Sequence, residues 1–239
     1  MTQPIMVTLP VSPYVELARW TLDRLGVAFR EEGHAPVFHV LATRRHGGTG
    51  VVPVLDLGDR SLTDARQVVQ HFDPISDPEV RAVFDDAFDV LGVAVRAWAY
   101  AYMLPQRAAT TRTWLVGIPD LERRLVPPLY PVLATLVGRE LKLTTASVGE
   151  QRAIMDAAVE RLAARLSDGR QYLCGGAFSQ ADRAVASLIA PAVLPPEYGG
   201  PLPSLAEMPD AMRRDVEHFR EHPVGEFALR VYREERRAG

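Results

Sequence analysis

The hydrophobic pattern divides the chain into a mixed first part and a helical second part. Up to residue 72, short apolar runs alternate with turns, which predicts strands at 5–9, 27–31, 54–57 and 60–62 and helices at 13–25, 37–45 and 64–72. From residue 79 onward the apolar residues recur at helical intervals, most clearly at 79–103, 147–166 and 179–191. We therefore expect two domains, 1–73 and 79–239, joined by a short proline-containing linker.

Prolines set the remaining boundaries of the helical part. Pro119, Pro127, Pro128 and Pro131 predict that this region is broken into short helices or loops, because proline removes a helical hydrogen bond. Residues 195–203 combine prolines and glycines without periodicity and are predicted to be loop.

Composition narrows the class of protein. A chain of 239 residues that is 47% hydrophobic can bury one large core or two modest ones. Its apolar runs stay below the ~18 residues that cross a bilayer, and its start lacks the pattern of a signal peptide, so we expect a cytoplasmic protein without membrane contact. The net charge is −3 and basic residues are scattered, which argues against nucleic acid as a partner.

Cysteine and histidine offer no clear metal or redox site. Cys174 is the only cysteine, which rules out an intramolecular disulfide and predicts a buried, unreactive thiol. The histidines in the first 50 residues do not share a helical face. His218 and His222 have helical spacing, but Pro223 follows and no third ligand is evident. We therefore expect no metal.

Two segments carry candidate chemistry. Pro53 stands at the head of a buried apolar run, where proline marks a sheet edge, a bulge or a cis turn and leaves backbone free for a ligand. Ser12 precedes Pro13 at the start of a helix, where a hydroxyl can donate to an anion that the helix amides also attract. The alternative is that Ser12 only caps the helix.

These segments resemble conserved parts of the glutathione transferase family. The resemblance rests on the runs 7–14, 50–55 and 62–65, together with Phe178–Asp182, which is similar to a capped helix start in the family, and it extends over nearly the whole chain. It implies a thioredoxin-like α/β N-terminal domain followed by an all-α helical C-terminal domain. We expect Ser179 and Asp182 to form a capping box, which is structural. The tail at 219–232 resembles the family's last helix.

The resemblance also implies roles for residues of the first domain. Ser12 would hold the thiolate of glutathione, Val52 would pair with the backbone of its cysteinyl group, and Pro53 would be cis. Asp64 would bind the γ-glutamyl ammonium group. Ala65 stands where the family usually has a serine, and the missing hydroxyl is worth about 1.5 to 3 kcal/mol, or roughly tenfold to a hundredfold in affinity.

An acceptor pocket is expected between the domains. Its candidate residues are Tyr14, Arg96, Trp98, Tyr102 and Trp114. Aromatic residues at helical spacing belong to a core as often as to a pocket, so the sequence leaves both interpretations open.

The resemblance implies a serine-type glutathione transferase with glutathione as co-substrate and no permanently bound cofactor. It would transfer the thiolate to a small hydrophobic electrophile or reduce a peroxide, and it would be a homodimer. Two alternatives remain: a non-catalytic dimerisation or binding module, which Ala65 favours, and a transferase for another low-molecular-weight thiol. Thiol-disulfide exchange is excluded, because Ser12 and Val15 replace both sulfurs of a glutaredoxin-like Cys-Pro-Tyr-Cys.

Overall fold

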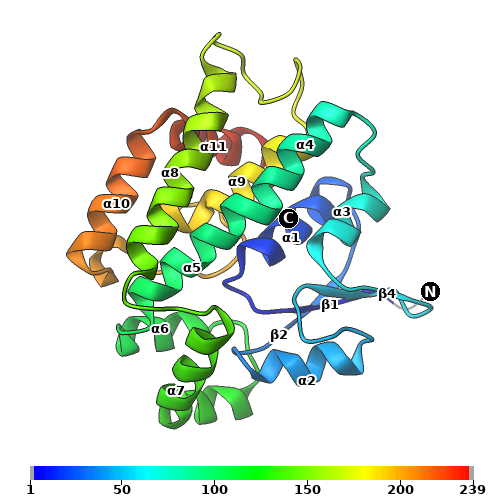
Figure 1. The fold of residues 1–239 in the computed structure, drawn as a ribbon. Helices are drawn as coiled ribbons and strands as arrows, with labels where there is room; N and C mark the ends of the chain where they lie inside the picture. Colours follow the sequence, from blue (N-terminus) through cyan, green and yellow to red (C-terminus); the bar gives the residue numbers. More distant parts are fainter. Residues whose placement is uncertain (1–2, 237–239) are drawn as a thin grey trace.

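The computed structural model describes residues 3–236 and begins with a small sheet packed between helices (Figure 1). Its strands are β1 (Ile5–Thr8), β2 (Arg30–Gly33), β3 (Val54–Asp56) and β4 (Ser61–Leu62), in the order β2-β1-β3-β4. Only the β1–β2 pair is parallel within this sheet. Helices α1 (Pro13–Arg24) and α3 (Ala65–Phe72) cover one face of the sheet, and α2 (Phe38–Arg45) covers the other.

Strand β2 lies later in the chain than its apolar residues predict. Ile5 pairs with Arg30 and Thr8 pairs with Gly33, so only residues 30–33 lie alongside β1. Val27 and Phe29 pack against the core from the segment that leads into the strand. The predicted range of 27–31 was therefore wrong at both ends, because pairing with β1 and not hydrophobicity defines this strand.

The Val52–Pro53 peptide bond is cis, as the family resemblance implied. It lies immediately before β3, whose Val54 and Leu55 are completely buried. Val52, immediately before it, lines the same cavity as Ser12, so two predicted site segments lie together.

The predicted helix at 79–103 is present but contains a π-helical segment. It comprises α4 (Pro78–Asp86), the π segment η1 (Ala87–Leu91) and α5 (Gly92–Met103). The Gly92 N–H donates to the carbonyl of Ala87 instead of that of Phe88. The Tyr14 hydroxyl donates to the free Phe88 carbonyl at 2.8 Å, which ties α1 to the helical part of the molecule. A Cβ at Gly92 would lie 2.8 Å from that hydroxyl, so this close approach requires glycine.

The proline-rich region forms one long helix, and our prediction of short helices or loops was wrong. After α6 (Arg107–Trp114), helix α7 runs from Asp120 to Glu140 and includes all three of its internal prolines. Pro131 cannot donate to the Pro127 carbonyl, and the Arg107 guanidinium donates to it instead at 2.9 Å. An external donor thus replaces a missing helical hydrogen bond, which lowers the cost of proline.

The helical part is completed by α8 (Ser147–Leu166), α9 (Gln180–Val193), η2 (Leu205–Glu207), α10 (Asp210–Glu221) and α11 (Pro223–Glu235). Helix α9 is almost entirely buried and packs against α1, α5, α10 and α11. The capping box predicted for its first turn is present, with the Ser179 N–H 2.7 Å from Asp182. Within the described residues, no helix combines the length and hydrophobicity of a membrane span.

The linker between the two parts is held by the start of α9. The Arg183 guanidinium, almost fully buried, bonds Asp73 at 2.7 Å, and Gln180 donates to the same carboxylate at 2.8 Å. The charged end of Arg183 thus anchors the linker to the first turn of α9.

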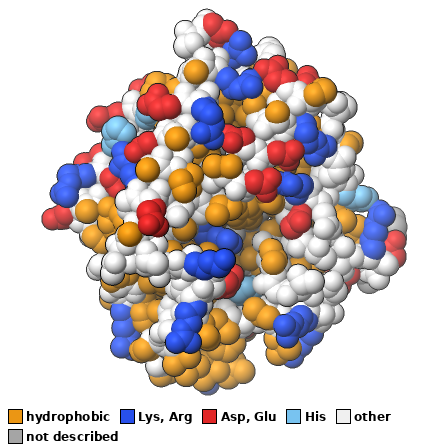
Figure 2. Space-filling model, in the orientation of Figure 1, with side chains coloured by type: hydrophobic (Ala, Val, Ile, Leu, Met, Phe, Trp, Pro, Cys, Tyr) orange, Lys and Arg blue, Asp and Glu red, His pale blue; other side chains and the backbone are white. Residues whose placement is uncertain are grey.

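The surface is mixed in charge. Acidic and basic side chains are interspersed over the face shown in Figure 2, and hydrophobic side chains gather at its lower edge, over α7. On that helix Leu129, Val132 and Leu136 are exposed.

Candidate functional site

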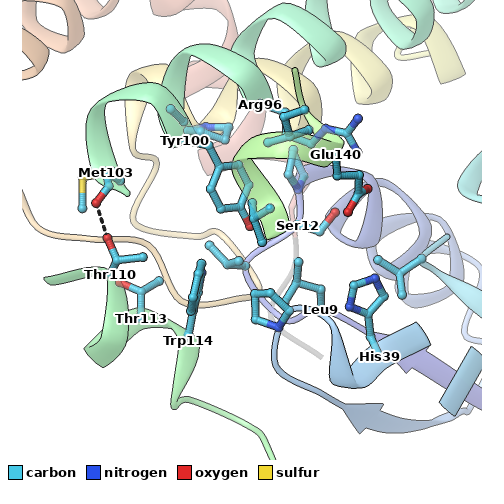
Figure 3. Close-up of a pocket in the computed structure, with 18 of the residues that line it drawn as sticks. Leu9, Ser12, His39, Arg96, Tyr100, Met103, Thr110, Thr113, Trp114 and Glu140 are labelled. Carbon is cyan, nitrogen blue, oxygen red and sulfur yellow. Dashed lines mark hydrogen bonds between the residues drawn. The ribbon is translucent and has the colours of Figure 1, made fainter. Parts of the chain in front are cut away.

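A cavity of about 290 Å³ lies between the first part of the molecule and the helices (Figure 3). One wall comes from the loop before α1, the loop at 50–52 and the start of α2. The opposite wall comes from α5, α6, the end of α7 and the loop at 202–203. Ser12 lies on the first wall, facing Arg96 and Tyr100 of α5.

The Ser12 hydroxyl is available to a ligand. Ser12 occupies the N-cap position of α1 with extended backbone, but its side chain makes no capping hydrogen bond, contrary to the purely structural interpretation. Within residues 3–236 the hydroxyl has no hydrogen-bond partner, although the side chain is largely buried. The first-turn amides of Tyr14 and Val15 are also unpaired with described residues. A hydroxyl and two amides therefore meet at one helix start.

Val52 presents its backbone beside this helix start. It lines the same cavity as Ser12, and neither its N–H nor its carbonyl is hydrogen-bonded to another described residue. An extended, unpaired backbone of this kind can pair with a peptide as an added strand does. The cis Pro53 that follows is buried.

The start of α3 carries the other two predicted glutathione contacts, Asp64 and Ala65. Asp64 caps the helix by accepting the Gln67 N–H at 2.7 Å, so part of its carboxylate is already engaged. Ala65 is buried, and the amides of Ala65 and Arg66 have no partner among the described residues. The Arg66 guanidinium bonds Asp89 at 2.6 Å. Neither Asp64 nor Ala65 lines the cavity.

The structure places only some of the predicted acceptor residues in the cavity. Arg96 and Trp114 line it. Tyr14 is bonded to the Phe88 carbonyl, and the side chains of Trp98 and Tyr102 donate to Asp215 at 3.1 and 3.2 Å. These three residues do not line the cavity, which corrects our placement of them, and their polar groups are bonded elsewhere.

Several lining residues were missed from the sequence. Prominent among them are His39, Tyr100, Met103, Thr110, Thr113, Glu140 and Leu202. Burial lowers the pKa of His39, which favours the neutral imidazole at pH 7, and burial raises the pKa of Tyr100 to about 12, which keeps the phenol protonated. A sequence signal existed for two of them: Tyr100 and Met103 share a helical spacing with Arg96 along one predicted helix.

Other titratable residues lie away from the cavity. Burial raises the pKa of the Cys174 thiol to about 11, which keeps it protonated and poorly nucleophilic. His34 pairs with Glu122 at 2.5 Å, and His46 pairs with Asp56 at 2.8 Å. Within the described residues no group of three side chains is arranged to bind a metal ion.

Two protein-family models match the chain. The model of the glutathione S-transferase N-terminal domain matches residues 6–79, and that of the C-terminal domain matches residues 145–213, together more than half of the chain. The chain belongs to the glutathione S-transferase family. The family is one of transferase enzymes, and the α/β first part followed by an all-helical part is its architecture. No curated protein sequence matches the chain.

Solved structures of the family share this fold. A glutathione S-transferase from Methylobacillus flagellatus with glutathione bound is 18% identical, with a TM-score of 0.55, and the match covers 95% of this chain and 98% of that one. One from Methylobacterium radiotolerans in complex with glutathione sulfonate is also 18% identical, with a TM-score of 0.55 and 95% of each chain covered. A glutathione transferase from Phanerochaete chrysosporium is 11% identical, with a TM-score of 0.63, covering 100% of this chain and 99% of that one.

Proposed function

We propose that this protein is a serine-type glutathione transferase in which Ser12 stabilises the glutathione thiolate. The observation that carries the proposal is the free Ser12 hydroxyl at the start of α1, in the same cavity as the unpaired backbone of Val52. Glutathione as co-substrate is supported by family membership and by related structures with glutathione bound. No permanently bound cofactor is required for this chemistry.

Glutathione would extend from this cavity toward α3. Its cysteinyl backbone would pair with Val52 beside the cis Pro53. Its γ-glutamyl ammonium would bind the Asp64 carboxylate oxygen that does not cap α3, and its γ-glutamyl carboxylate would accept from the free amides of Ala65 and Arg66. Ala65 supplies no hydroxyl to that carboxylate, so glutathione binds more weakly than it would to serine at this position.

The reaction would take place where the cavity opens toward α5 and α6. The thiolate sulfur forms a bond to the electrophilic carbon, the leaving group departs with the bonding electrons, and the thiol proton has already passed to solvent. Apolar lining residues of this region include Val11, Trp114, Met103 and Leu202, which fits a small hydrophobic electrophile.

A second candidate is a binding module that uses the same fold without catalysis, and Ala65 favours it. The two functions differ in a direct measurement. We would titrate glutathione by calorimetry and measure its conjugation to 1-chloro-2,4-dinitrobenzene, using the parent protein and Ala65→Ser. Ala28→Ser is the control, because Ala28 is an exposed residue outside the site.

Ala65→Ser should bind glutathione about tenfold more tightly and lower its KM, because it adds a donor to a charged group. Ala28→Ser should match the parent. If neither the parent nor Ala65→Ser shows binding or a glutathione-dependent rate, the transferase proposal fails and the binding module replaces it.

We also propose a cytoplasmic homodimer, in line with the family. Size-exclusion chromatography with light scattering tests the assembly, and a monomer at micromolar concentration would contradict it.

A further inference from the structure

Arg96 is a cation on the cavity wall that forms no ion pair with a described residue. It extends from the middle of α5 toward Ser12 (Figure 3). Among the described residues no carboxylate lies within ion-pair distance of it, and its Nε is buried without a hydrogen-bond partner. Its guanidinium carbon lies 5.8 Å from the centre of the Tyr14 ring, a contact that satisfies none of its N–H groups. Most arginines of this chain, in contrast, bond a carboxylate or a carbonyl.

A buried guanidinium N–H without an acceptor is costly, so the orphaned Nε–H of Arg96 beside a ligand cavity indicates an absent partner. The partner must be an acceptor with negative charge, because arginine donates five N–H groups and accepts none. A planar carboxylate matches the guanidinium through two parallel hydrogen bonds. The partner should carry a single negative charge, because Arg96 is the only arginine or lysine among the cavity-lining residues.

Glu140 is the other charged group on the cavity wall, at the end of α7. Both charges act on the phenol of Tyr100: Arg96 lowers its pKa and Glu140 raises it, with Arg96 having the larger effect. Glu140 is nevertheless not within ion-pair distance of Arg96, so it does not occupy the guanidinium's donors. His39, on the opposite wall, adds no compensating charge, because burial favours its neutral form.

The surroundings of Arg96 define the rest of the ligand. Ala99, Met103 and Trp114 form an apolar surface next to it, and Tyr100 lies with its ring 6.5 Å from that of Trp114. Apolar and aromatic walls of this kind bury an aromatic or branched hydrocarbon body. A ligand that fits both features has an apolar body and one carboxylate.

We propose that the acceptor substrate is a small aromatic electrophile that carries a carboxylate, bound by Arg96. This inference rests on the proposed transferase function and specifies the substrate class of the same cavity. The carboxylate would accept two hydrogen bonds from Arg96, with the ring against Trp114 and the electrophilic carbon toward Ser12. For a chloroaromatic acid, the glutathione sulfur bonds the ring carbon, the carbon–chlorine bond breaks and chloride leaves.

Calorimetry without glutathione tests the carboxylate site independently of catalysis. We would compare 4-chloro-3-nitrobenzoate with the neutral 4-chloro-3-nitrobenzamide, which has the same ring. The parent should prefer the carboxylate by about tenfold or more, the range of a charge-assisted hydrogen bond. Arg96→Met should abolish this preference, and Arg96→Lys should keep part of it because it retains the charge but not the planar fork.

Two further variants sharpen the test. Glu140→Gln should increase the preference for the carboxylate, because it removes a negative charge from the cavity wall. Arg112→Met is the matched control: Arg112 lies on α6 outside the cavity, its side chain is 61% exposed, and it pairs with Glu207. It should keep the preference of the parent. Equal affinity of the parent for the acid and the amide, or an unchanged preference in Arg96→Met, would overturn the proposal.

Conjugation of the same two compounds to glutathione separates the two proposals. The acid and the amide differ in intrinsic reactivity, but this difference is the same for every variant. The change in the acid-to-amide ratio of kcat/KM between a variant and the parent therefore reports binding at the site alone. Arg96→Met should lower the acid-to-amide ratio by about tenfold. A loss that is equal for both compounds and accompanied by a raised pKa of the bound thiol would instead assign Arg96 to the thiolate and refute the carboxylate site. A parent that binds the acid through Arg96 but conjugates neither compound would refute the transferase and leave the carboxylate site standing.

Discussion

Replacing Ser12 with alanine should raise the pKa of bound glutathione without unfolding the protein. The Ser12 hydroxyl makes no capping bond to α1, so its removal leaves the helix start unchanged. Asp64, in contrast, does cap α3. The variant should therefore retain the thermal stability of the parent, and a loss of activity can be assigned to the ligand.

The expected size follows from the groups present at the helix start. A free thiol has a pKa near ~8.5, and lowering it by ~2 units requires about 2.7 kcal/mol. The partly buried end of α1 contributes up to about 2 kcal/mol, and a hydroxyl that donates to a thiolate contributes about 1.5 to 3 kcal/mol. Losing the hydroxyl should raise the thiol pKa by about 1 to 2 units.

The assay is the pH dependence of conjugation with 1-chloro-2,4-dinitrobenzene, together with the ultraviolet absorption of the bound thiolate. Near pH ~6.5 Ser12→Ala should lose about tenfold to a hundredfold in rate, because most of the bound thiol is protonated. Above the raised pKa the rate should recover, because the bound thiol is then ionised and a more basic thiolate is the better nucleophile. Ser76→Ala, in the exposed linker, is the control. An equal loss at every pH, with no change in thiolate absorption, would refute the role of Ser12.

Three further predictions concern charged groups. Asp64→Asn should keep the cap of α3 but raise the KM for glutathione, whereas an unchanged KM would place the ammonium elsewhere. Asp73→Ala should lower the free energy of unfolding, measured by urea titration, by about 2 kcal/mol. This is less than the roughly 3 to 5 kcal/mol for a fully buried ion pair, because the Asp73 side chain is 29% exposed. Adding Arg183→Met should recover part of the loss, because it removes the buried charge left without a partner. The hydrogen bond to Glu122 raises the pKa of His34. The stabilisation from protonated His34 should therefore be complete below about pH 6.5 and be lost as the pH rises through the raised pKa. A difference in unfolding free energy between the parent and His34→Asn that grows with pH would contradict this.

Local features of the sequence determined much of the fold. Helix α8 begins and ends where its periodicity predicts, because its apolar stripe needs only a surface to pack against. The capping box at Ser179 also follows from neighbouring residues, since caps depend on short-range chemistry. The cis bond before Pro53, in contrast, was one of three local possibilities, and only the family resemblance selected it. The helix start made Ser12 a candidate, but its proposed role toward a thiolate, and any role for Val52, came only through resemblance to a family.

Tertiary structure decided the continuity of α7 and the position of β2. Three prolines predict a broken helix, but Arg107, from another helix, supplies the donor that Pro131 lacks. Hydrophobicity places β2 at 27–31, but the register with β1 places it at 30–33. In each case the partner is distant in sequence, and a local pattern contains no information about which hydrogen bonds another segment can offer.

The composition of the cavity was also decided by tertiary structure. Arg96, Trp98 and Tyr102 lie on one helix, and periodicity alone could not show that only Arg96 faces the cavity while Asp215 of α10 binds the other two. The sequence by itself determined elements such as α8 and the capped start of α9, because those choices are made within a few residues. The inward or outward direction of a polar side chain depends on partners from other elements, and only the folded chain brings those partners together.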